Sequence, residues 1–453
     1  MEFTGKKVLV VGTGKSGIAA FALLKKKQAD LILFEGNKDA KIEEIREKAE
    51  VFSDARIVIG ELPDEVKKNL DIVVLSPGVP TDLPMVNDLR DRGVLIIGEI
   101  ELAYQCAKGD ILAITGTNGK TTTTALLGEI MEHVKDDVKV VGNIGIPYTS
   151  VADETKEDTV TVAEISSFQL ETAVEFKPKV TAILNITPDH LNRHHTMENY
   201  IAAKESITKN QDSAGVCVLN YDDTVLREFG KTLSCKAVYF SSREKLQDGF
   251  YLDGENILFA EAGKTTVVCN VNELNLLGRH NYENVMAATA MAYYYGVSFD
   301  KIKEVLVRFK AVEHRIEYVT EKRGVKFYND SKGTNPDAAI QGIRAMNRPT
   351  FLIGGGYDKQ SEYDEWIEAF DGKVKKLVLI GATREKIANT AKKHGFHEFV
   401  FADTLEEAVN ICYENAVSGD AVLLSPACAS WDMFQSYEQR GEMFKEIVTG
   451  LKE

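Results

Sequence analysis

The sequence contains no hydrophobic run long enough to cross a bilayer. No stretch approaches the roughly eighteen apolar residues that a membrane helix needs, and the segment 1–7 has no apolar region before the first predicted strand. We therefore expect no signal peptide, no membrane span and no membrane partner. The expected location is the cytoplasm.

Positive charge and paired cysteines are also scarce. The chain has 54 Lys and Arg against 69 Asp and Glu, a net charge of -15. Such a surface disfavours general binding to nucleic acid, so an anionic ligand must meet local positive charge. The six cysteines form no C-x-x-C pair, which excludes the usual zinc and redox motifs and predicts reduced, packed thiols.

One stretch predicts a cradle for phosphate groups. Residues 111–114 are apolar and predict a strand, residues 116–121 read Gly-Thr-Asn-Gly-Lys-Thr, and Leu126 and Ile130 continue at helical spacing. A glycine-bearing turn between strand and helix presents backbone N–H groups, and the lysine adds a full positive charge. The full P-loop pattern would have glycine at Ile114, so an ordinary strand-to-helix turn remains the alternative.

A second glycine-rich turn lies near the N-terminus. Residues 7–11 predict a strand, residues 12–17 read G-x-G-x-x-G, and a helix begins near Ile18. A second strand at 31–34 ends in Glu35, at the distance where dinucleotide-binding folds place a ribose-binding carboxylate. The motif specifies only a backbone that approaches a diphosphate closely. A dinucleotide, another diphosphate and plain fold architecture all remain open.

Polar side chains follow two further predicted strands in the middle of the chain. Strand 160–163 leads to Glu164, and strand 180–186 leads to Asp189 and His190. A carboxylate at a strand end beside a phosphate loop is a typical magnesium ligand, and a buried, satisfied acid is the alternative. His190 alone is more often structural, but beside Asp189 it forms a reasonable second metal site.

Several other residues are ambiguous from pattern alone. Lys204 lies on a predicted amphipathic helix, where a solvated lysine is the default, and Asn281 begins a helix that runs to Tyr295, where it could be an N-cap. The polar cluster 329–336 follows a strand at 325–328 and predicts a binding loop. Glycines 354–356 lack dinucleotide spacing and predict a tight turn.

Taken together, these motifs resemble those of the Mur ligases over the whole chain. The matching segments, in chain order, are 116–121, 143–145, 164–170, 189–190, 203–204, 278–281, 314–315, 329–332 and 425–430. The resemblance also covers the departure at Ile114, which is normal for that family. It implies three α/β domains: a Rossmann-like UDP-sugar-binding domain (1–96), a P-loop ATPase-like domain with a mostly parallel sheet that binds ATP (97–311), and a Rossmann-like amino-acid-binding domain (312–453).

The resemblance further implies ATP-dependent amide formation in peptidoglycan precursor synthesis. The implied substrates are UDP-N-acetylmuramoyl-L-alanine and D-glutamate, joined through an acyl phosphate and a tetrahedral intermediate by a monomeric enzyme. The implied cofactors are ATP and two Mg²⁺ ions, with Thr121 and Glu164 at the first ion and His190 and a carbamylated Lys204 at the second. Lys332 resembles a residue near the transferred phosphate.

The remaining roles are also implied by resemblance. The expected catalytic residues are Lys120, His190, Lys204, Arg315 and Lys332. The expected ATP site comprises Gly116, Thr117, Asn118, Gly119, Lys120, Thr121, Thr122, Asn281, Arg315 and Asp330. The expected UDP-sugar site comprises Lys15, Ser16, Glu35, Ser76, Asn143 and His190. The expected D-glutamate site comprises Thr334, Lys359, Ser430 and Tyr437.

Three other functions remain open at this point. An NAD-dependent dehydrogenase would leave the central phosphate loop unexplained. A ligase for another amino acid, or a folate polyglutamylating enzyme, would share that loop but differ in the first domain and in residues 425–430. A nucleotide-gated switch would bind ATP without releasing phosphate in response to an amino acid.

Overall fold

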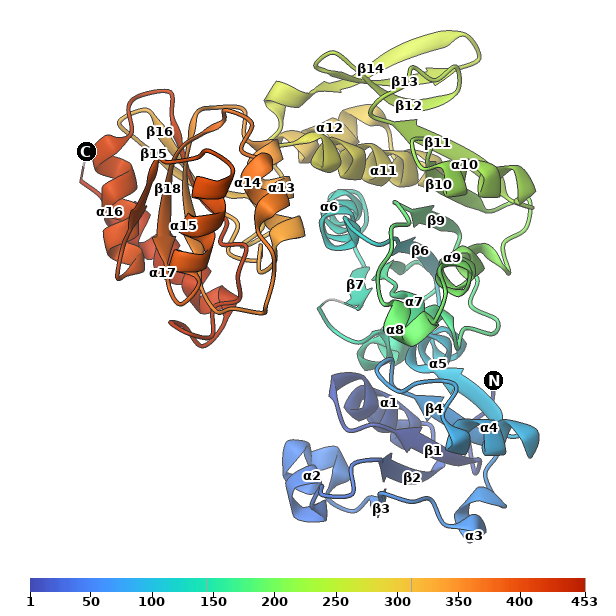
Figure 1. The fold of residues 1–453 in the computed structure, drawn as a ribbon. Helices are drawn as coiled ribbons and strands as arrows, with labels where there is room; N and C mark the ends of the chain where they lie inside the picture. Colours follow the sequence, from blue (N-terminus) through green and yellow to red (C-terminus); the bar gives the residue numbers. More distant parts are fainter. Residues whose placement is uncertain (144, 311, 453) are drawn as a thin grey trace. The chain divides into compact units, whose positions relative to one another are not determined.

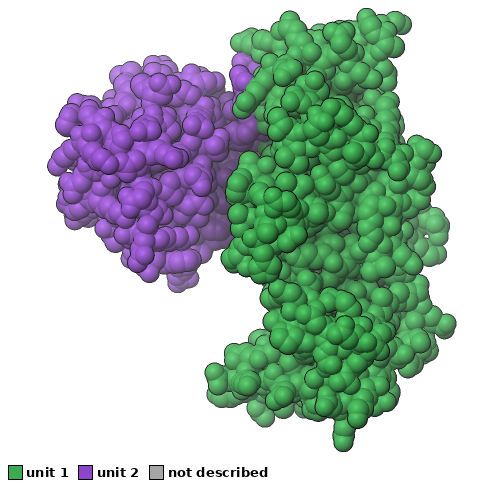
Figure 2. Space-filling view, turned by 45° about the vertical axis from the view of Figure 1, so that its right-hand side comes forward, with its two compact units in different colours: residues 1–269, 283–305 green, residues 270–282, 306–453 purple. Residues whose placement is uncertain are grey.

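The computed structural model describes residues 1–143, 145–310 and 312–452. Ile144, in the predicted motif 143–145, and Ala311 and Glu453, at predicted domain ends, lie outside the described residues. The chain forms two compact units, coloured green and purple in Figure 2. Unit 1 comprises 1–269 and 283–305, and unit 2 comprises 270–282 and 306–453.

Unit 1 begins with a five-stranded, wholly parallel sheet (Figure 1). Its spatial order is β3 (Arg56–Ile59), β2 (Asp30–Glu35), β1 (Lys7–Val11), β4 (Ile72–Leu75) and β5 (Leu95–Gly98). The helices of this region are α1 (Lys15–Lys26), α2 (Ile42–Lys48), α3 (Asp64–Lys67), α4 (Pro84–Asp91) and α5 (Glu99–Cys106).

Strand β1 shows why this segment is a central strand. Val8 and Val10 belong to one buried apolar cluster, whereas Leu9 and Val11 belong to another. Successive side chains of a strand point to opposite faces, so an uninterrupted apolar run is stable only where both faces are covered. The continuous apolar pattern of the predicted strand is therefore explained by two-sided burial.

The second sheet of unit 1 has nine strands. Its order is β14 (Lys264–Asn270), β13 (Asn256–Glu261), β12 (Gly249–Asp253), β11 (Lys236–Ser241), β10 (Val216–Asn220), β9 (Val180–Ile183), β6 (Asp110–Thr115), β8 (Val160–Glu164) and β7 (Val138–Gly142). The strands from β7 to β12 pair in parallel, and β13 is antiparallel to β12. The helices are α6 (Lys120–Glu132), α7 (Ser167–Leu170), α8 (Leu191–His194), α9 (Met197–Glu205), α10 (Thr224–Phe229), α11 (Arg279–Tyr295) and α12 (Phe299–Arg308).

Unit 2 is built on a six-stranded sheet. Its order is β15 (Glu317–Lys322), β16 (Val325–Asn329), β20 (Ala421–Leu424), β17 (Thr350–Gly355), β18 (Val374–Ile380) and β19 (Phe399–Phe401). Only the edge pair β15 and β16 is antiparallel among the pairings described. The helices are α13 (Pro336–Ala345), α14 (Asp364–Glu368), α15 (Arg384–Lys393), α16 (Leu405–Asn415) and α17 (Tyr437–Gly450).

The predicted class, three α/β regions with mostly parallel sheets, is confirmed. The predicted boundaries at 96/97 and 311/312 stay predictions. All six cysteines are free, as expected, and five of them are buried. No described helix combines the length and apolar character that a membrane crossing requires.

The prediction of a tight turn at glycines 354–356 is wrong for its first two residues, because β17 extends to Gly355. A Cβ atom on Gly354 would lie 2.6 Å from the Trp366 ring, and one on Gly355 would lie 2.2 Å from the carbonyl oxygen of Ile380. Close packing of the strand end, rather than a reversal of the chain, explains these glycines.

A buried carboxylate in α5 holds a loop of unit 1 in place. Glu101 is 1% exposed and accepts hydrogen bonds from the backbone N–H groups of Val174, Glu175 and Phe176, at 2.8 to 3.1 Å. Charge-assisted hydrogen bonds are the stronger kind, and a buried donor without an acceptor is costly.

We expect Glu101→Gln to lower the apparent melting temperature by about 5 °C, because its amide turns an N–H group toward three N–H donors. Differential scanning fluorimetry provides the measurement. The control is Glu61→Gln, at an exposed glutamate of the same unit, which should melt like the wild type. An unchanged melting temperature for Glu101→Gln would show that these hydrogen bonds do not stabilise the unit.

Candidate active site

The loop between β6 and α6 has the geometry of a phosphate cradle. Gly116 has φ +145° and Gly119 has φ +86°, values that favour glycine. A Cβ atom on Gly119 would also lie 2.2 Å from the Asn284 side-chain oxygen. The first turn of α6 carries no acidic side chain and no side-chain cap among the described residues. No group of the helix itself therefore offsets the partial positive charge at its N-terminus.

Two lysines converge on this loop. The Lys120 ammonium donates to the carbonyl oxygens of Gly116 and Thr117, both at 2.9 Å. The Lys204 ammonium, from α9, donates to the same Gly116 oxygen at 2.8 Å and lies 4.6 Å from the centre of the Tyr200 ring. The loop therefore concentrates two positive charges at one carbonyl oxygen.

Burial changes the protonation of both lysines. Lys204 is only 2% exposed, so the solvated lysine suggested by its sequence pattern is wrong. Burial, reinforced by the charge of Lys120, lowers the pKa of Lys204 to about 7. Burial also lowers the pKa of Lys120, although Glu164 and Asp189 act in the opposite direction. Near neutral pH a substantial fraction of Lys204 is therefore the neutral, nucleophilic amine.

Glu164 provides a negative group beside the loop. It ends β8, pairs in register with Ile114 of β6 and is 1% exposed. One carboxylate oxygen accepts from the Asn143 amide at 3.0 Å, and the other is buried without a hydrogen-bond partner among the described residues. An unpaired buried carboxylate oxygen is unfavourable unless a cation meets it, so this residue fits a magnesium ligand.

Thr121 and His190, two other predicted metal ligands, differ in exposure. Thr121 lies in the first turn of α6 and is partly buried. His190 is an exposed residue with φ +52° that precedes α8, and its ring packs edge-on against Phe168 at 4.9 Å. Its Nε2 lies 3.5 Å from the Asp189 carboxylate.

Sequence reasoning missed several residues that organise this loop. The Asn185 side chain accepts from the Asn118 N–H at 2.8 Å and donates to the Asn118 carbonyl at 3.1 Å. The Tyr200 hydroxyl lies 3.0 Å from the Thr117 hydroxyl, and buried His194 contacts Ser167 at 2.9 Å. A polar Asn185 inside the predicted strand 180–186 was the available signal.

The N-terminal glycine-rich turn is closely packed. Gly12 has φ +104°, and a Cβ atom there would lie 2.7 Å from the Ser76 hydroxyl oxygen. That oxygen is buried and has no hydrogen-bond partner in the described part of the chain. The structure therefore places Ser76 directly against the turn that Lys15 and Ser16 follow at the start of α1.

Glu35 is tied to the same turn. Its carboxylate accepts from the Thr13 hydroxyl at 2.7 Å and from the Asn37 N–H at 3.1 Å. The Lys48 ammonium, which sequence reasoning also missed, donates to the Thr13 hydroxyl at 2.9 Å. The predicted group of glycine turn, Glu35 and Ser76 is thus assembled at one edge of the first sheet, at the carboxyl ends of β1, β2 and β4.

In unit 2, Asp330 follows β16 and is completely buried. It accepts from the Ser425 hydroxyl at 2.7 Å and from the Ile316 N–H at 3.3 Å, and it thereby joins two loops. Burial raises the pKa of Asp330 to about 6, although the Arg315 guanidinium and these hydrogen bonds lower it.

Asn281 is also buried and lies in the first turn of α11, so the N-cap alternative is wrong. Its amide donates to the Leu277 carbonyl at 2.8 Å.

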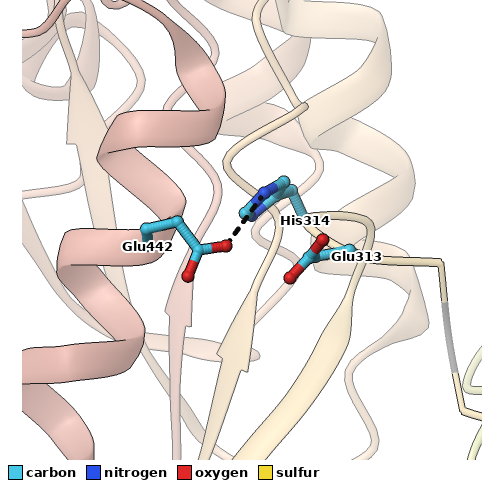
Figure 3. A group of neighbouring side chains, drawn as sticks. All are labelled: Glu313, His314 and Glu442. Carbon is cyan, nitrogen blue, oxygen red and sulfur yellow. Dashed lines mark ion pairs between the residues drawn. The ribbon is translucent and has the colours of Figure 1, made fainter.

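Figure 3 shows Glu313, His314 and Glu442 with their ligand-type atoms turned toward one another, a grouping that could hold a metal ion. The Lys445 ammonium lies 2.8 Å from Glu442 and also pairs with Glu313. The local negative charge is therefore already met by a lysine. His314, with φ +63°, donates its backbone N–H to Glu317 at 2.9 Å.

Three of the predicted amino-acid-binding residues, Thr334, Lys359 and Ser430, lie in loops that follow β16, β17 and β20, and Tyr437 is the first residue of α17. Ser430 is 2% exposed, Lys359 is exposed, and Thr334 and Tyr437 are partly buried. The Lys332 ammonium lies 5.9 Å from the centre of the Tyr437 ring. Among the described residues, no hydrogen bond or ion pair joins Thr334, Lys359 and Ser430 to one another.

Arg440, which sequence reasoning missed, fixes these loops. It is 1% exposed and donates to the hydroxyl and carbonyl oxygens of Ser331, both at 2.9 Å, and to the Cys428 carbonyl at 3.2 Å. The loops that carry Lys332 and Ser430 are therefore held together by one guanidinium.

Glycine turns, a two-lysine phosphate loop and a buried carboxylate on mostly parallel sheets define an α/β nucleotide-binding protein. The chain matches the Mur ligase MurD-like N-terminal domain over 6–98, the Mur ligase middle domain over 114–292 and the Mur ligase glutamate ligase domain over 314–428. The chain belongs to the Mur ligase family and is a ligase.

Relatives named UDP-N-acetylmuramoylalanine–D-glutamate ligase align over the full length of both chains. The relative from Lachnoclostridium phytofermentans is 57% identical, and that from Clostridioides difficile is 47% identical. Among solved structures, UDP-N-acetylmuramate-alanine ligase from Thermotoga maritima has a TM-score of 0.60 at 18% identity, covering 99% of this chain and 100% of that chain. MurF from Acinetobacter baumannii has a TM-score of 0.61 at 17% identity, covering 97% and 93%. These structures support the fold.

The lowered pKa of Lys204 makes the stability of the protein depend on pH. Its value of about 7 in the folded chain lies below the ordinary 10.5, so between these values the unfolded chain binds more protons. The titration of Lys204 therefore makes the free energy of unfolding rise as pH rises across this window. As pH falls toward 7, the same titration lowers the free energy of unfolding.

We expect Lys204→Met to flatten this rise between about pH 7 and 9, because methionine does not titrate. Urea unfolding in buffer free of carbon dioxide measures the effect without carbamate formation. Lys68→Met, at an exposed lysine of the same unit, should keep the slope of the wild type. Parallel slopes for the wild type and Lys204→Met would contradict the assignment.

Proposed function

We propose that this chain joins D-glutamate to UDP-N-acetylmuramoyl-L-alanine, converting ATP to ADP and phosphate, as a cytoplasmic monomer without a membrane or nucleic-acid partner. The observation that carries the proposal is the full-length identity of 47–57% to relatives of that name. The two-lysine loop beside a buried carboxylate supports it, because it offers the charges that phosphoryl transfer needs.

The chemistry starts from an unreactive carboxylate. Its oxygen attacks the γ-phosphorus of ATP, the bond to the β-γ bridging oxygen breaks, and ADP leaves as an acyl phosphate forms. The amine of D-glutamate then attacks the acyl carbon and gives a tetrahedral intermediate. Loss of inorganic phosphate and of the amine proton yields the amide.

Lys120 acts on the phosphate oxygens in this proposal. Its ammonium lies at the loop, where it donates to two loop carbonyl oxygens, and it would donate to the oxygens of a phosphate bound there. The backbone of Gly116, Thr117, Asn118, Gly119, Thr121 and Thr122 would surround the same group. By the family resemblance, Arg315 and Lys332 would add positive charge near the transferred phosphoryl group.

Two magnesium ions complete the proposed site. Thr121 and Glu164 would hold the first ion, and His190 and a carbamylated Lys204 would hold the second. When bound, the ions neutralise phosphate charge and polarise the oxygens that react. The partnerless Glu164 oxygen supports the first assignment.

The carbamate on Lys204 would require a neutral amine, because an ammonium group has no lone pair to attack carbon dioxide. A pKa of about 7 supplies that amine near neutral pH. Attack forms an N–C bond and releases one proton, and it replaces a buried cation with an oxyanion that can bind a metal. This change would also relieve the repulsion between Lys204 and Lys120.

The substrates would meet residues from all three sheets. Lys15, Ser16, Glu35 and Ser76 would contact the uridine diphosphate, with Asn143 and His190 near the muramoyl-alanine end. Asn281 and Asp330 would contact the adenosine, although Asp330 already has two hydrogen-bond partners. The D-glutamate site would comprise Thr334, Lys359, Ser430 and Tyr437, where a cation and hydroxyls suit carboxylates.

We expect phosphate release from ATP to require both UDP-N-acetylmuramoyl-L-alanine and an amino acid, and to be fastest with D-glutamate. A colorimetric phosphate assay with D-glutamate, L-glutamate, D-glutamine, L-alanine and L-lysine tests the reaction and its specificity together. Release that is independent of the amino acid would indicate a nucleotide switch, and a faster reaction with another amino acid would reject the proposed substrate.

We expect Lys332→Ala to bind ATP nearly as well as the wild type but to lose turnover by roughly a hundredfold or more, because it removes one preorganised charge donor. Isothermal titration with ATP and the phosphate assay separate these effects. Lys326→Ala, on the neighbouring strand β16, is the matched control and should retain activity. Normal turnover by Lys332→Ala would remove this residue from the mechanism.

A further inference from the structure

Two large aromatic side chains of unit 2 are exposed next to each other. Trp431 is 63% exposed and Tyr357 is 43% exposed, and their ring centres lie 5.5 Å apart at an interplanar angle of 56°. Single exposed apolar residues are common, but a contacting pair that includes tryptophan leaves a sizeable apolar surface in water. We call Tyr357 and Trp431 the aromatic pair.

The backbone beneath the aromatic pair is firmly held. The Tyr357 N–H donates to the Ala429 carbonyl at 2.9 Å, and the buried Arg440 guanidinium donates to the same oxygen at 3.4 Å. Gly356 has φ +146°, and a Cβ atom there would lie 2.3 Å from that oxygen. The two loops therefore approach each other as closely as glycine permits, and the aromatic pair has a rigid base.

The aromatic pair restrains a lysine. The Lys359 ammonium lies 5.2 Å from the centre of the Trp431 ring, within the range of a cation–π interaction. The adjacent Asp358 is directed to Lys386 at 3.6 Å, and no ion pair to Lys359 occurs among the described residues. The Trp431 ring face thus orients the Lys359 ammonium, and no carboxylate in the described part of the chain neutralises its charge.

We propose that Trp431 is a positioning residue that holds the Lys359 ammonium for a carboxylate of the amino-acid substrate and so contributes to the selection of acidic amino acids. The proposal rests on the proposed function, in which Lys359 and Ser430 bind D-glutamate. Trp431 follows Ser430 in the chain and its ring contacts the Lys359 ammonium, so the indole is tied to two of the four residues proposed to bind D-glutamate. A ring face orients the ammonium without consuming its charge, which a carboxylate partner would do.

Steady-state kinetics of Trp431→Leu and Trp431→Phe test this role. Leucine keeps apolar bulk but has no π face, so we expect KM for D-glutamate to rise about fivefold, with kcat and KM for ATP within about twofold of the wild type. Phenylalanine keeps a π face and should restore most of the lost affinity. The matched control is Tyr318→Leu, since Tyr318 is 42% exposed and has Lys326 over its ring at 5.8 Å.

A double-mutant cycle with Lys359→Met isolates the coupling. If Trp431 acts through Lys359, then Trp431→Leu should change KM for D-glutamate by less than about twofold in the Lys359→Met background. An equal fivefold effect in both backgrounds would overturn the positioning role, as would a normal KM in the Trp431→Leu single variant.

Tryptophan fluorescence supplies a readout that a purely structural role would not change. The chain has two tryptophans, and Trp366 is fully buried, so D-glutamate should alter the emission of exposed Trp431. The titration uses the full chain with UDP-N-acetylmuramoyl-L-alanine and a non-hydrolysable ATP analogue, and the change should disappear in Trp431→Phe. Constant emission in the wild type at saturating D-glutamate would contradict the inference.

The failure of this inference can be distinguished from the failure of the proposed function. If the wild type releases no phosphate with D-glutamate, the proposed function fails and the inference fails with it. If the wild type is active and Lys359→Met raises KM while Trp431→Leu does not, the proposed function stands and the inference alone is wrong.

Discussion

The convergence of two lysines on one carbonyl oxygen is the constraint on which the central site depends. Lys120 and Lys204 both donate to Gly116 in a largely buried environment, and burial lowers the pKa of each. Two cations so close together in a poorly hydrated place are stable only when anions approach them or when one gives up its proton. Glu164 places one negative charge nearby, and the proposed binding of phosphate and the proposed carbamate on Lys204 would each lower the repulsion further.

In unit 2, buried polar side chains hold the loops at the carboxyl ends of parallel strands in defined conformations. Arg440 joins the loops that carry Lys332 and Ser430, and Asp330 joins Ser425 to the backbone of Ile316. Because these groups are buried, a displaced partner would leave a polar group without a hydrogen bond, which costs free energy. Burial therefore constrains the distances and angles of these contacts. Charged side chains such as Lys359 can then be presented from a rigid base.

Much of the fold could be predicted because local patterns were strong. The strands at 7–11, 31–34 and 111–114 are largely apolar runs followed by turn residues, and the structure confirms them. Strand 180–186 was predicted too long, since Asn185 leaves the strand to hold Asn118. The strands between 236 and 270 were not predicted because their exposed and buried residues alternate irregularly, and their pairing depends on long-range contacts.

The sequence by itself determined the class of fold, the phosphate loop and the family, because these depend on glycine and lysine spacing within short segments. Tertiary structure alone decided that Lys204 is buried against Gly116, that Asp330 is enclosed and that Trp431 lies under Lys359. Burial, pKa and side-chain contacts arise from residues that are distant in the chain, and no local pattern encodes which of them meet.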